Sequence, residues 1–182
     1  MTFILGLTGS IGMGKSTTAS LFKKHGVPVY DADQTVHYLY RGRLAPLIEV
    51  DRARLSAHVV GHPEKLKQLE SIVHPVVQEE QDLFIQKHRH SPLIVLDIPL
   101  LFENGKDRHC DAVAVVSTDA ATQRKRVMLR EGMTEEKMDI LLSRQMSDIE
   151  KRQRAQFLID TSRDIPHAER QVVSILKTLS GR

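Results

Sequence analysis

Short runs of apolar residues recur along the chain, and each is long enough for one buried strand. Helical patterns fall between most of these runs. Strand and helix in alternation predict an α/β fold with a parallel sheet and right-handed crossovers. The five predicted strands are Phe3–Leu7, Val27–Tyr30, Leu93–Leu96, Ala112–Val116 and Phe157–Ile159.

Three stretches place apolar residues three or four positions apart, which is the spacing of one helix face. The first is Lys15–Lys24, and the last runs roughly from Pro166 to Leu179. Between them, Thr134 is a candidate N-cap, because its hydroxyl can accept a bond from a first-turn amide. The apolar residues after this cap are Met138, Leu142, Met146 and Ile149.

Two segments do not follow the alternation. Residues 34–92 contain no convincing strand and are predicted to form a helical insertion. Residues 118–152 are highly charged and helical, and Gly132 is expected to separate two helices there. Most of that charge is expected to form a solvated helix face.

Composition favours one globular domain. The chain has 182 residues, of which 41% are hydrophobic and 27% charged, and its net charge is only +3. This charge suits anionic small molecules and is too weak to indicate nucleic acid. The single cysteine excludes an intrachain disulfide and favours a reducing cytoplasm. We also expect neither a signal peptide nor a membrane span, since no apolar run is long enough.

The segment from Gly9 to Ser16 matches G-x-x-x-x-G-K-[ST] without a mismatch, and it lies between a predicted strand and a predicted helix. Glycines let backbone N–H groups turn inward to hold phosphate, and the helix N-terminus adds partial positive charge. Lys15 is expected to reach the β- and γ-phosphates, and the Ser16 hydroxyl to bind Mg²⁺. The alternative is a glycine-rich turn before a lysine. The flanking elements favour a nucleoside triphosphate site instead.

Two aspartates, Asp31 and Asp33, follow the second predicted strand. The carboxyl ends of strands in an open α/β sheet face the ligand, so at least one should look toward the phosphate loop. A carboxylate there can orient an acceptor hydroxyl and take its proton. The alternative is that Asp33 caps a helix through Val36–Tyr40.

Asp97 follows the apolar run Leu93–Leu96, which is the general form of a Walker B strand. Such an aspartate usually lies near Mg²⁺. Pro99 is expected to end the strand and turn the chain.

These segments, taken together and in this order, resemble the dephospho-CoA kinase family over nearly the whole chain. The resemblance rests on "LTGSIGMGKST", "DAD", His74-Pro75, "DIPLLFE", Arg144-Gln145 and Lys151-Arg152. It implies a P-loop kinase fold related to nucleoside monophosphate kinases: a five-stranded parallel sheet flanked by helices, with a helical acceptor-binding insertion and a helical lid. Residues 1–33, 93–117 and 153–182 would form the nucleotide-binding core, residues 34–92 the acceptor domain, and residues 118–152 the lid.

The resemblance implies transfer of the γ-phosphoryl group of ATP, with Mg²⁺, to the ribose 3′-hydroxyl of dephospho-CoA, the last step of coenzyme A synthesis. Asp33, Lys15 and Arg144 would be catalytic, and Ser16 and Asp97 would hold the metal. The nucleotide would contact Ile11, Gly12, Met13, Gly14, Lys15, Ser16, Thr17, Arg126 and Arg144. The acceptor would contact Thr8, Asp33, His74, Pro75, Pro99 and Leu100.

Two of these assignments have structural alternatives. Arg126 and Arg130 are four residues apart, and Arg144 and Lys151 are seven apart, so each pair could present a basic helix face to phosphate or could form surface ion pairs. His74 could instead mark a helix break, because a following proline disfavours αR backbone.

The chain departs from the family pattern at two places. Within residues 41–56 the chain is shorter than its relatives, which indicates either a real deletion or a flexible segment missing from the sequence. Thr161 and Ser162 stand where relatives often have Asn or Gly, in a loop expected near the adenine.

Two rival functions stay open on sequence alone. A shikimate-like kinase would share the phosphate loop and the Asp-x-Asp, and a P-loop switch would bind nucleotide and change shape for a partner. On the favoured interpretation the partner is dephospho-CoA, with no nucleic acid and no membrane, and the chain is a monomer or weak homo-oligomer in the cytoplasm.

Overall fold

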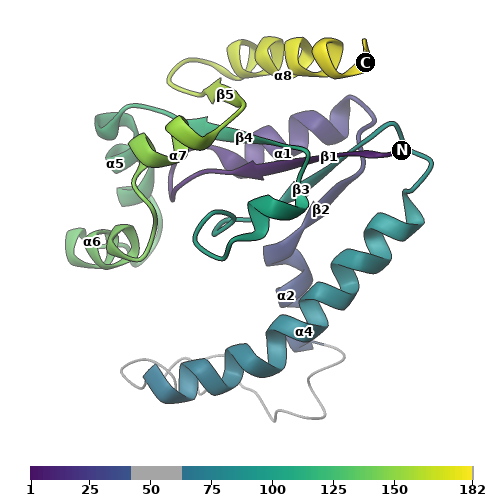
Figure 1. Cartoon of the computed structure of the whole chain (residues 1–182). Coiled ribbons are helices and arrows are strands. Elements are labelled where there is room, and N and C mark those ends of the chain that lie inside the picture. The colour runs from purple at the N-terminus through teal and green to yellow at the C-terminus, as the bar shows by residue number, and fades with distance from the viewer. Residues whose placement is uncertain (42–62, 182) are drawn as a thin grey trace. The chain divides into compact units, whose positions relative to one another are not determined.

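The computed structural model describes residues 1–41 and 63–181 (Figure 1). Its centre is a five-stranded sheet with the order β2-β3-β1-β4-β5, and the β1–β3, β1–β4 and β4–β5 pairs are parallel. All five predicted strands are confirmed, each with a boundary shifted by one or two residues. The strands are β1 (Phe3–Thr8), β2 (Val29–Asp31), β3 (Leu93–Asp97), β4 (Ala112–Ser117) and β5 (Phe157–Asp160).

Strand β1 lies between β3 and β4, and the register sets which loops are neighbours. Leu7 pairs with Asp97 of β3, and Thr8 pairs with Val115 of β4. The carboxyl ends of these three strands therefore lie along one edge of the sheet. The chain order reverses on the two sides of β1, and this is where open α/β sheets bind their ligands.

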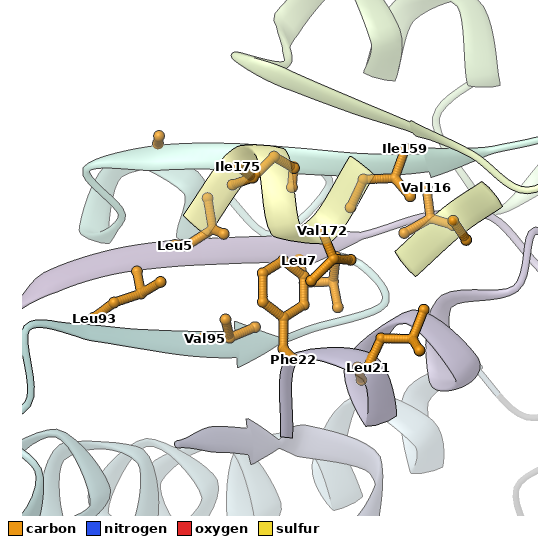
Figure 2. Close-up of a cluster of buried hydrophobic side chains, with 14 residues drawn as sticks. Leu5, Leu7, Leu21, Phe22, Leu93, Val95, Val116, Ile159, Val172 and Ile175 are labelled. Atoms are coloured by element: carbon orange, nitrogen blue, oxygen red, sulfur yellow. The ribbon is translucent and has the colours of Figure 1, made fainter. Parts of the chain in front are cut away.

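Helices α1 (Lys15–Lys24) and α8 (Ile165–Ser180) pack against each other and cover one face of the sheet. Figure 2 shows Phe22 of α1 between side chains of β1 and α8. Phe22, Leu5, Leu7 and Val172 are fully buried. Burying one such side chain contributes about 1.5–3 kcal/mol, so this cluster is the main source of stability for the sheet and its two helices.

On the opposite face of β1, Gly6 leaves room for the segment that follows β3. A Cβ on Gly6 would lie 2.9 Å from both Cys110 Sγ and Leu101 Cδ2, so only glycine fits without a shift. The short helix η1 (Lys106–His109) leads into Cys110, and the side chain of Leu101 is fully buried.

The charged stretch forms three helices, α5 (Ala120–Met128), α6 (Glu135–Ser143) and α7 (Asp148–Arg154). Gly132, with φ 71°, separates α5 from α6, and the Thr134 hydroxyl accepts from the Lys137 amide, as predicted. The single helix expected to continue to Ile149 is wrong. Ser147 forms a capping box with Glu150 and starts a new helix, and Ile149 is 69% exposed.

Residues Asp31–Lys87 form a second compact unit, while Met1–Tyr30 and His88–Arg182 form the first. Among its described residues the second unit contains α2 (Ala32–Arg41) and α4 (Pro63–Lys87) and no helix break at His74. Pro75 lies inside α4, so the predicted break there is wrong. Leu39 of α2 packs with Val73 and Val77 of α4 in a small core.

Cys110 gives a test of the packing around Gly6. Burial raises the pKa of the Cys110 thiol to about 12 from 9.0, and Asp107 and Asp111 add to the rise. Because the thiolate is the nucleophile, we expect iodoacetamide to leave Cys110 unmodified at pH 8 in the native protein and to alkylate it readily in denaturant. Mass spectrometry measures both, and rapid alkylation of native protein would contradict the burial of this thiol.

Candidate nucleotide-binding site

The segment from Gly9 to Ser16 joins β1 to α1 at the edge where β3 and β4 also end. Gly12 and Gly14 have φ of 77° and 89°, in the left-handed region that other residues avoid. Gly14 is the N-cap of α1 and supplies no side-chain cap. The amides of the first turn therefore remain available to an anion, and the helix dipole favours one there.

Helix α5 and the segment after β5 pack closely against this phosphate loop. A Cβ on Gly12 would lie 2.6 Å from Val127 Cγ2, and a Cβ on Gly14 would lie 3.2 Å from Thr161 Oγ1. The two glycines are thus required by close packing as well as by backbone conformation.

Three polar side chains hold the loop backbone from outside. Gln123 Nε2 donates to the Ile11 carbonyl at 2.8 Å, and the Ile11 amide donates to Gln145 Oε1 at 3.2 Å. The Thr161 hydroxyl donates to the Met13 carbonyl at 2.7 Å. The Met13 side chain is itself buried, with its sulfur 3.2 Å from the Thr118 amide. These contacts hold the loop backbone in one conformation.

Lys15 forms an ion pair with Asp97 Oδ1. Asp97 extends β3 on the side of Leu93 and Val95, which face α1, so the strand alternation brings its carboxylate to the first residue of that helix. Asp97 is 1% exposed. The loop lysine and the predicted Walker B aspartate thus meet at the base of the phosphate loop.

Residues suited to a divalent cation lie beside this pair. Ser16 is exposed at the N-terminus of α1, and its hydroxyl oxygen and the Asp97 carboxylate are both hard ligands of the kind Mg²⁺ prefers. No group of three or more His, Cys, Asp or Glu residues in the described parts of the chain could hold a metal by itself. This donor set fits a cation that takes its other ligands from phosphate and water.

Next to the loop lies a hollow of about 200 Å³. Gly14 and Thr17 line one side, and Arg126, Thr161 and Ile165 line others. The Arg126 guanidinium donates to Thr161 Oγ1 at 3.0 Å and to the Thr161 carbonyl. Arg126 is therefore held in a fixed orientation at the wall of the hollow.

Asp160 shapes the loop that carries Thr161. Its carboxylate accepts from the Ser162 amide at 2.8 Å and from the Ser162 hydroxyl at 3.0 Å. The bond from the Ser162 amide contributes most to lowering the pKa of Asp160 below its ordinary value. The carboxylate therefore stays ionised and keeps this turn closed near neutral pH.

The two candidate arginines differ in their surroundings, and neither forms the surface ion pair considered above with any residue in the described part of the chain. Arg126 is half-buried against Thr161, while Arg144 is exposed at the C-cap of α6 and has no side-chain hydrogen bond or ion pair with a described residue. The predicted shared helix faces are wrong. Arg130 lies beyond the end of α5, and a turn between α6 and α7 separates Arg144 from Lys151.

Lys151 also differs from the prediction that it contributes to a basic surface. Its side chain is fully buried, and Nζ lies 2.9 Å from Glu103 Oε1. A lysine buried against a carboxylate cannot present its charge to a phosphate group in this conformation.

On the other face of β1, the Thr8 hydroxyl donates to the Pro99 carbonyl at 2.9 Å. Pro99 and Leu100 follow β3 and are half-buried. These three residues, predicted to contact the acceptor, therefore lie together beside the phosphate loop.

The remaining predicted acceptor residues belong to the second unit, and their approach to the phosphate loop stays a prediction. Asp33 is exposed in the first turn of α2. The helix is capped by Asp31, whose carboxylate accepts from the Gln34 amide at 2.8 Å, so the capping role considered for Asp33 belongs to its neighbour. His74 and Pro75 are exposed on α4.

Sequence reasoning missed the groups that hold the loop in shape. Gln123 lies in a charged helical stretch without any motif, and Gln145 drew attention only through the resemblance. Thr161 was noted only as a departure from the family. No spacing rule reports a bond across more than a hundred residues, such as the one between Gln145 and Ile11.

No helix among residues 1–41 and 63–181 combines the length and the apolar character that crossing a membrane requires.

Comparison with known proteins places this chain in a family. The family model described as dephospho-CoA kinase matches residues 3–44 and 43–167. The dephospho-CoA kinase of Brucella melitensis is 48% identical over 192 residues, covering 98% of this chain and 96% of that protein. The dephospho-CoA kinase of Rhodopseudomonas palustris strain BisB18 is 50% identical, covering 95% of this chain and 94% of that protein.

The aligned length of 192 exceeds the 182 residues of this chain, so the Brucella protein carries residues that this chain lacks. The two segments of the family match meet at residues 43–44, within the region predicted to be shorter than in relatives. That region, within residues 41–56, lies almost entirely outside the described residues.

A crystal structure has the same fold over nearly the whole chain. TT1252 from Thermus thermophilus has a TM-score of 0.81 and 34% sequence identity, with 98% of each chain covered. The similarity to these relatives extends over nearly the whole chain, and so it includes the phosphate loop, the strand that ends at Asp97 and the flanking helices. The chain belongs to the dephospho-CoA kinase family.

Proposed function

We propose that this protein transfers the γ-phosphoryl group of ATP to the ribose 3′-hydroxyl of dephospho-CoA, giving coenzyme A and ADP. The observation that carries the proposal is the phosphate loop with Lys15 paired to Asp97, in a chain of this family. Such a loop binds a triphosphate, and the family indicates the acceptor.

The nucleotide would bind with its phosphates on the loop amides and its base in the hollow beside Arg126. The loop amides of the first turn of α1 and the Lys15 ammonium supply positive potential along the triphosphate. A planar guanidinium held flat by Thr161 can stack on a purine, and the hollow of about 200 Å³ is of the right order for one ring system. Ile165 adds an apolar contact.

Ser16 and Asp97 would hold Mg²⁺ when ATP is bound. The metal would supply positive charge that neutralises the triphosphate during transfer. Lys15 must then exchange its contact with Asp97 for one with phosphate oxygen. This exchange costs little free energy, because the lysine keeps a negatively charged partner throughout.

Asp33 would orient the ribose hydroxyl and accept its proton. Phosphoryl transfer asks the protein mainly for positioning and charge, so an exposed carboxylate in the first turn of α2 suits this role better than the cap residue Asp31. Residues 34–92 would bind the acceptor, with His74 and Pro75 in contact with it, and Thr8, Pro99 and Leu100 on the core side. Residues 118–152 would act as the lid, and residues 1–33, 93–117 and 153–182 as the core.

The proposed reaction takes place in the cytoplasm, with dephospho-CoA as partner and no nucleic acid or membrane, and with the protein as a monomer or weak homo-oligomer. A coupled assay for ADP, with dephospho-CoA as the only acceptor, tests the proposal directly. The new phosphate should be found on the ribose 3′ position by NMR. Faster ADP release with shikimate instead would favour the rival kinase class.

The role of Lys15 can be tested by its removal. We expect Lys15→Ala to lower kcat by roughly 10²–10³-fold, because the transferred group loses a preorganised cation. The matched control is Lys23→Ala, an exposed lysine on the same helix, which should behave as the parent does. Near-normal turnover by Lys15→Ala would contradict the phosphate contact.

The two aspartates of the Asp-x-Asp can be separated in the same way. Asp33→Asn should lower kcat by roughly 10²–10⁴-fold with little change in ATP affinity or melting temperature. Asp31→Asn should retain activity, because asparagine caps a helix about as well as aspartate. If the kinetic loss follows Asp31 instead, the proposed base is the wrong residue.

The arginines are expected to act on different parameters. Arg126→Ala should raise KM for ATP about tenfold, since a stacked base contact is lost, while Arg144→Ala should lower kcat by roughly 10²-fold, since the charge near the transferred group is lost. Arg130→Ala, exposed beyond the end of α5, is the control. Steady-state kinetics with ATP varied distinguishes the two effects, and interchanged effects would reverse the assignment.

A further inference from the structure

A buried ion pair lies beneath the turn between α6 and α7, outside the residues assigned to the reaction. Lys151 Nζ is 2.9 Å from Glu103 Oε1, and the side chains of Lys151 and Glu103 are 0% and 15% exposed. Removing an ammonium group completely from water costs free energy, and its attraction to one carboxylate rarely exceeds that cost. The pair therefore needs an explanation other than stability.

The neighbouring polar atoms support this view. Glu103 Oε2 and Asp148 Oδ1 are buried without a hydrogen-bond partner among the described residues. A cluster selected for stability alone would satisfy these atoms or replace the charges with apolar side chains.

Glu103 also makes a contact that leads to the phosphate loop. Its Oε1 accepts from the Met146 amide at 2.8 Å. Met146 follows Gln145, whose Oε1 accepts from the Ile11 amide, and Arg144 directly precedes Gln145. Glu103 Oε1 thus fixes the backbone next to two side chains: Gln145, which binds the phosphate loop, and Arg144, which is proposed to act on the nucleotide.

The rest of the turn is anchored in a way that makes Glu103 central. The Ser147 capping box closes the start of α7, and Asp148 accepts from the Ser117 hydroxyl at the end of β4 at 2.7 Å. Lys151 lies one turn further along α7 and returns to Glu103. The turn is therefore tied to β4 and to the segment after β3, and Glu103 accepts a hydrogen bond from the Met146 amide in the turn and forms an ion pair with Lys151 of α7.

We infer that Glu103 is a positioning residue for ATP: paired with Lys151, it holds the turn at Met146 so that Gln145 stays against Ile11 of the phosphate loop. This inference rests on the proposed function, in that ATP is the ligand of the loop. Glu103 acts through Met146 and Gln145 and does not touch the nucleotide. The ion pair with Lys151 holds the Glu103 carboxylate in place.

Two double variants separate positioning from stability. Both remove the buried charges: Glu103→Leu with Lys151→Met also removes the acceptor for the Met146 amide, while Glu103→Gln with Lys151→Met keeps an oxygen there. Replacing a buried ion pair with neutral side chains of similar size should leave both variants folded. We expect the Leu variant to raise the Kd for a non-hydrolysable ATP analogue about tenfold, the scale of one lost hydrogen bond to a positioned group. The Gln variant should restore the parental Kd.

Calorimetric titration measures these Kd values without an acceptor, so the outcome does not depend on whether dephospho-CoA is phosphorylated. The proposed function is tested separately by turnover of the parent protein. Thermal denaturation curves establish that both double variants are folded. Equal Kd values for two folded variants would overturn the inference.

A third variant keeps the inference testable if the Leu variant does not fold. Gln145→Leu removes the acceptor for the Ile11 amide without altering the buried pair, and it should raise the same Kd by a similar factor. Where the Leu double variant does fold, combining it with Gln145→Leu should raise the Kd little further, because both act on one chain of contacts. A parental Kd in Gln145→Leu, or losses that simply add, would show that Glu103 does not act through this clamp.

Discussion

A glycine-rich loop that offers its backbone amides to an anion has to be held in shape by its surroundings, and most of this structure follows from that constraint. Gln123, Gln145 and Thr161 bind its carbonyls and amide from three different segments of the chain. Glycine at positions 12 and 14 is what allows those segments to come so close. The anion site is therefore a property of the whole first unit.

The two faces of the sheet have different roles, and the strand register decides which side chains lie on each. Side chains of β1 and β3 that face α1 form the apolar core and end in Asp97, which meets Lys15. The alternate positions face the segment after β3, where Thr8 bonds to Pro99 and Gly6 accommodates Leu101 and Cys110. Because successive residues alternate faces, a shift of one residue between β1 and β3 would separate Lys15 from Asp97. The packing of the core thus fixes the electrostatics of the site.

Much of the fold could be predicted from sequence because buried parallel strands are continuous apolar runs and the phosphate loop has a specific motif. The errors share a physical cause. Met138, Leu142 and Met146 have helical spacing, yet the Met146 amide bonds to Glu103 and Ser147 caps a new helix. Asp31 and Asp33 are equivalent in sequence, and only the start of α2 shows which one caps it. Lys151 lies in a charged run, and nothing local predicts that a carboxylate 48 positions earlier buries it.

The two lysine–carboxylate pairs illustrate how burial decides what an ion pair can do. Lys15 is 12% exposed and borders a loop that attracts phosphate, so a ligand can replace Asp97 as its partner without leaving a charge unpaired. Lys151 is fully buried, and no ligand can reach it. Breaking its contact with Glu103 would therefore leave an unpaired charge in the protein interior. The first pair can therefore exchange partners when an anion binds, whereas the second must persist. A permanent pair is suited to fixing the position of a turn, and an exchangeable pair is suited to receiving a substrate.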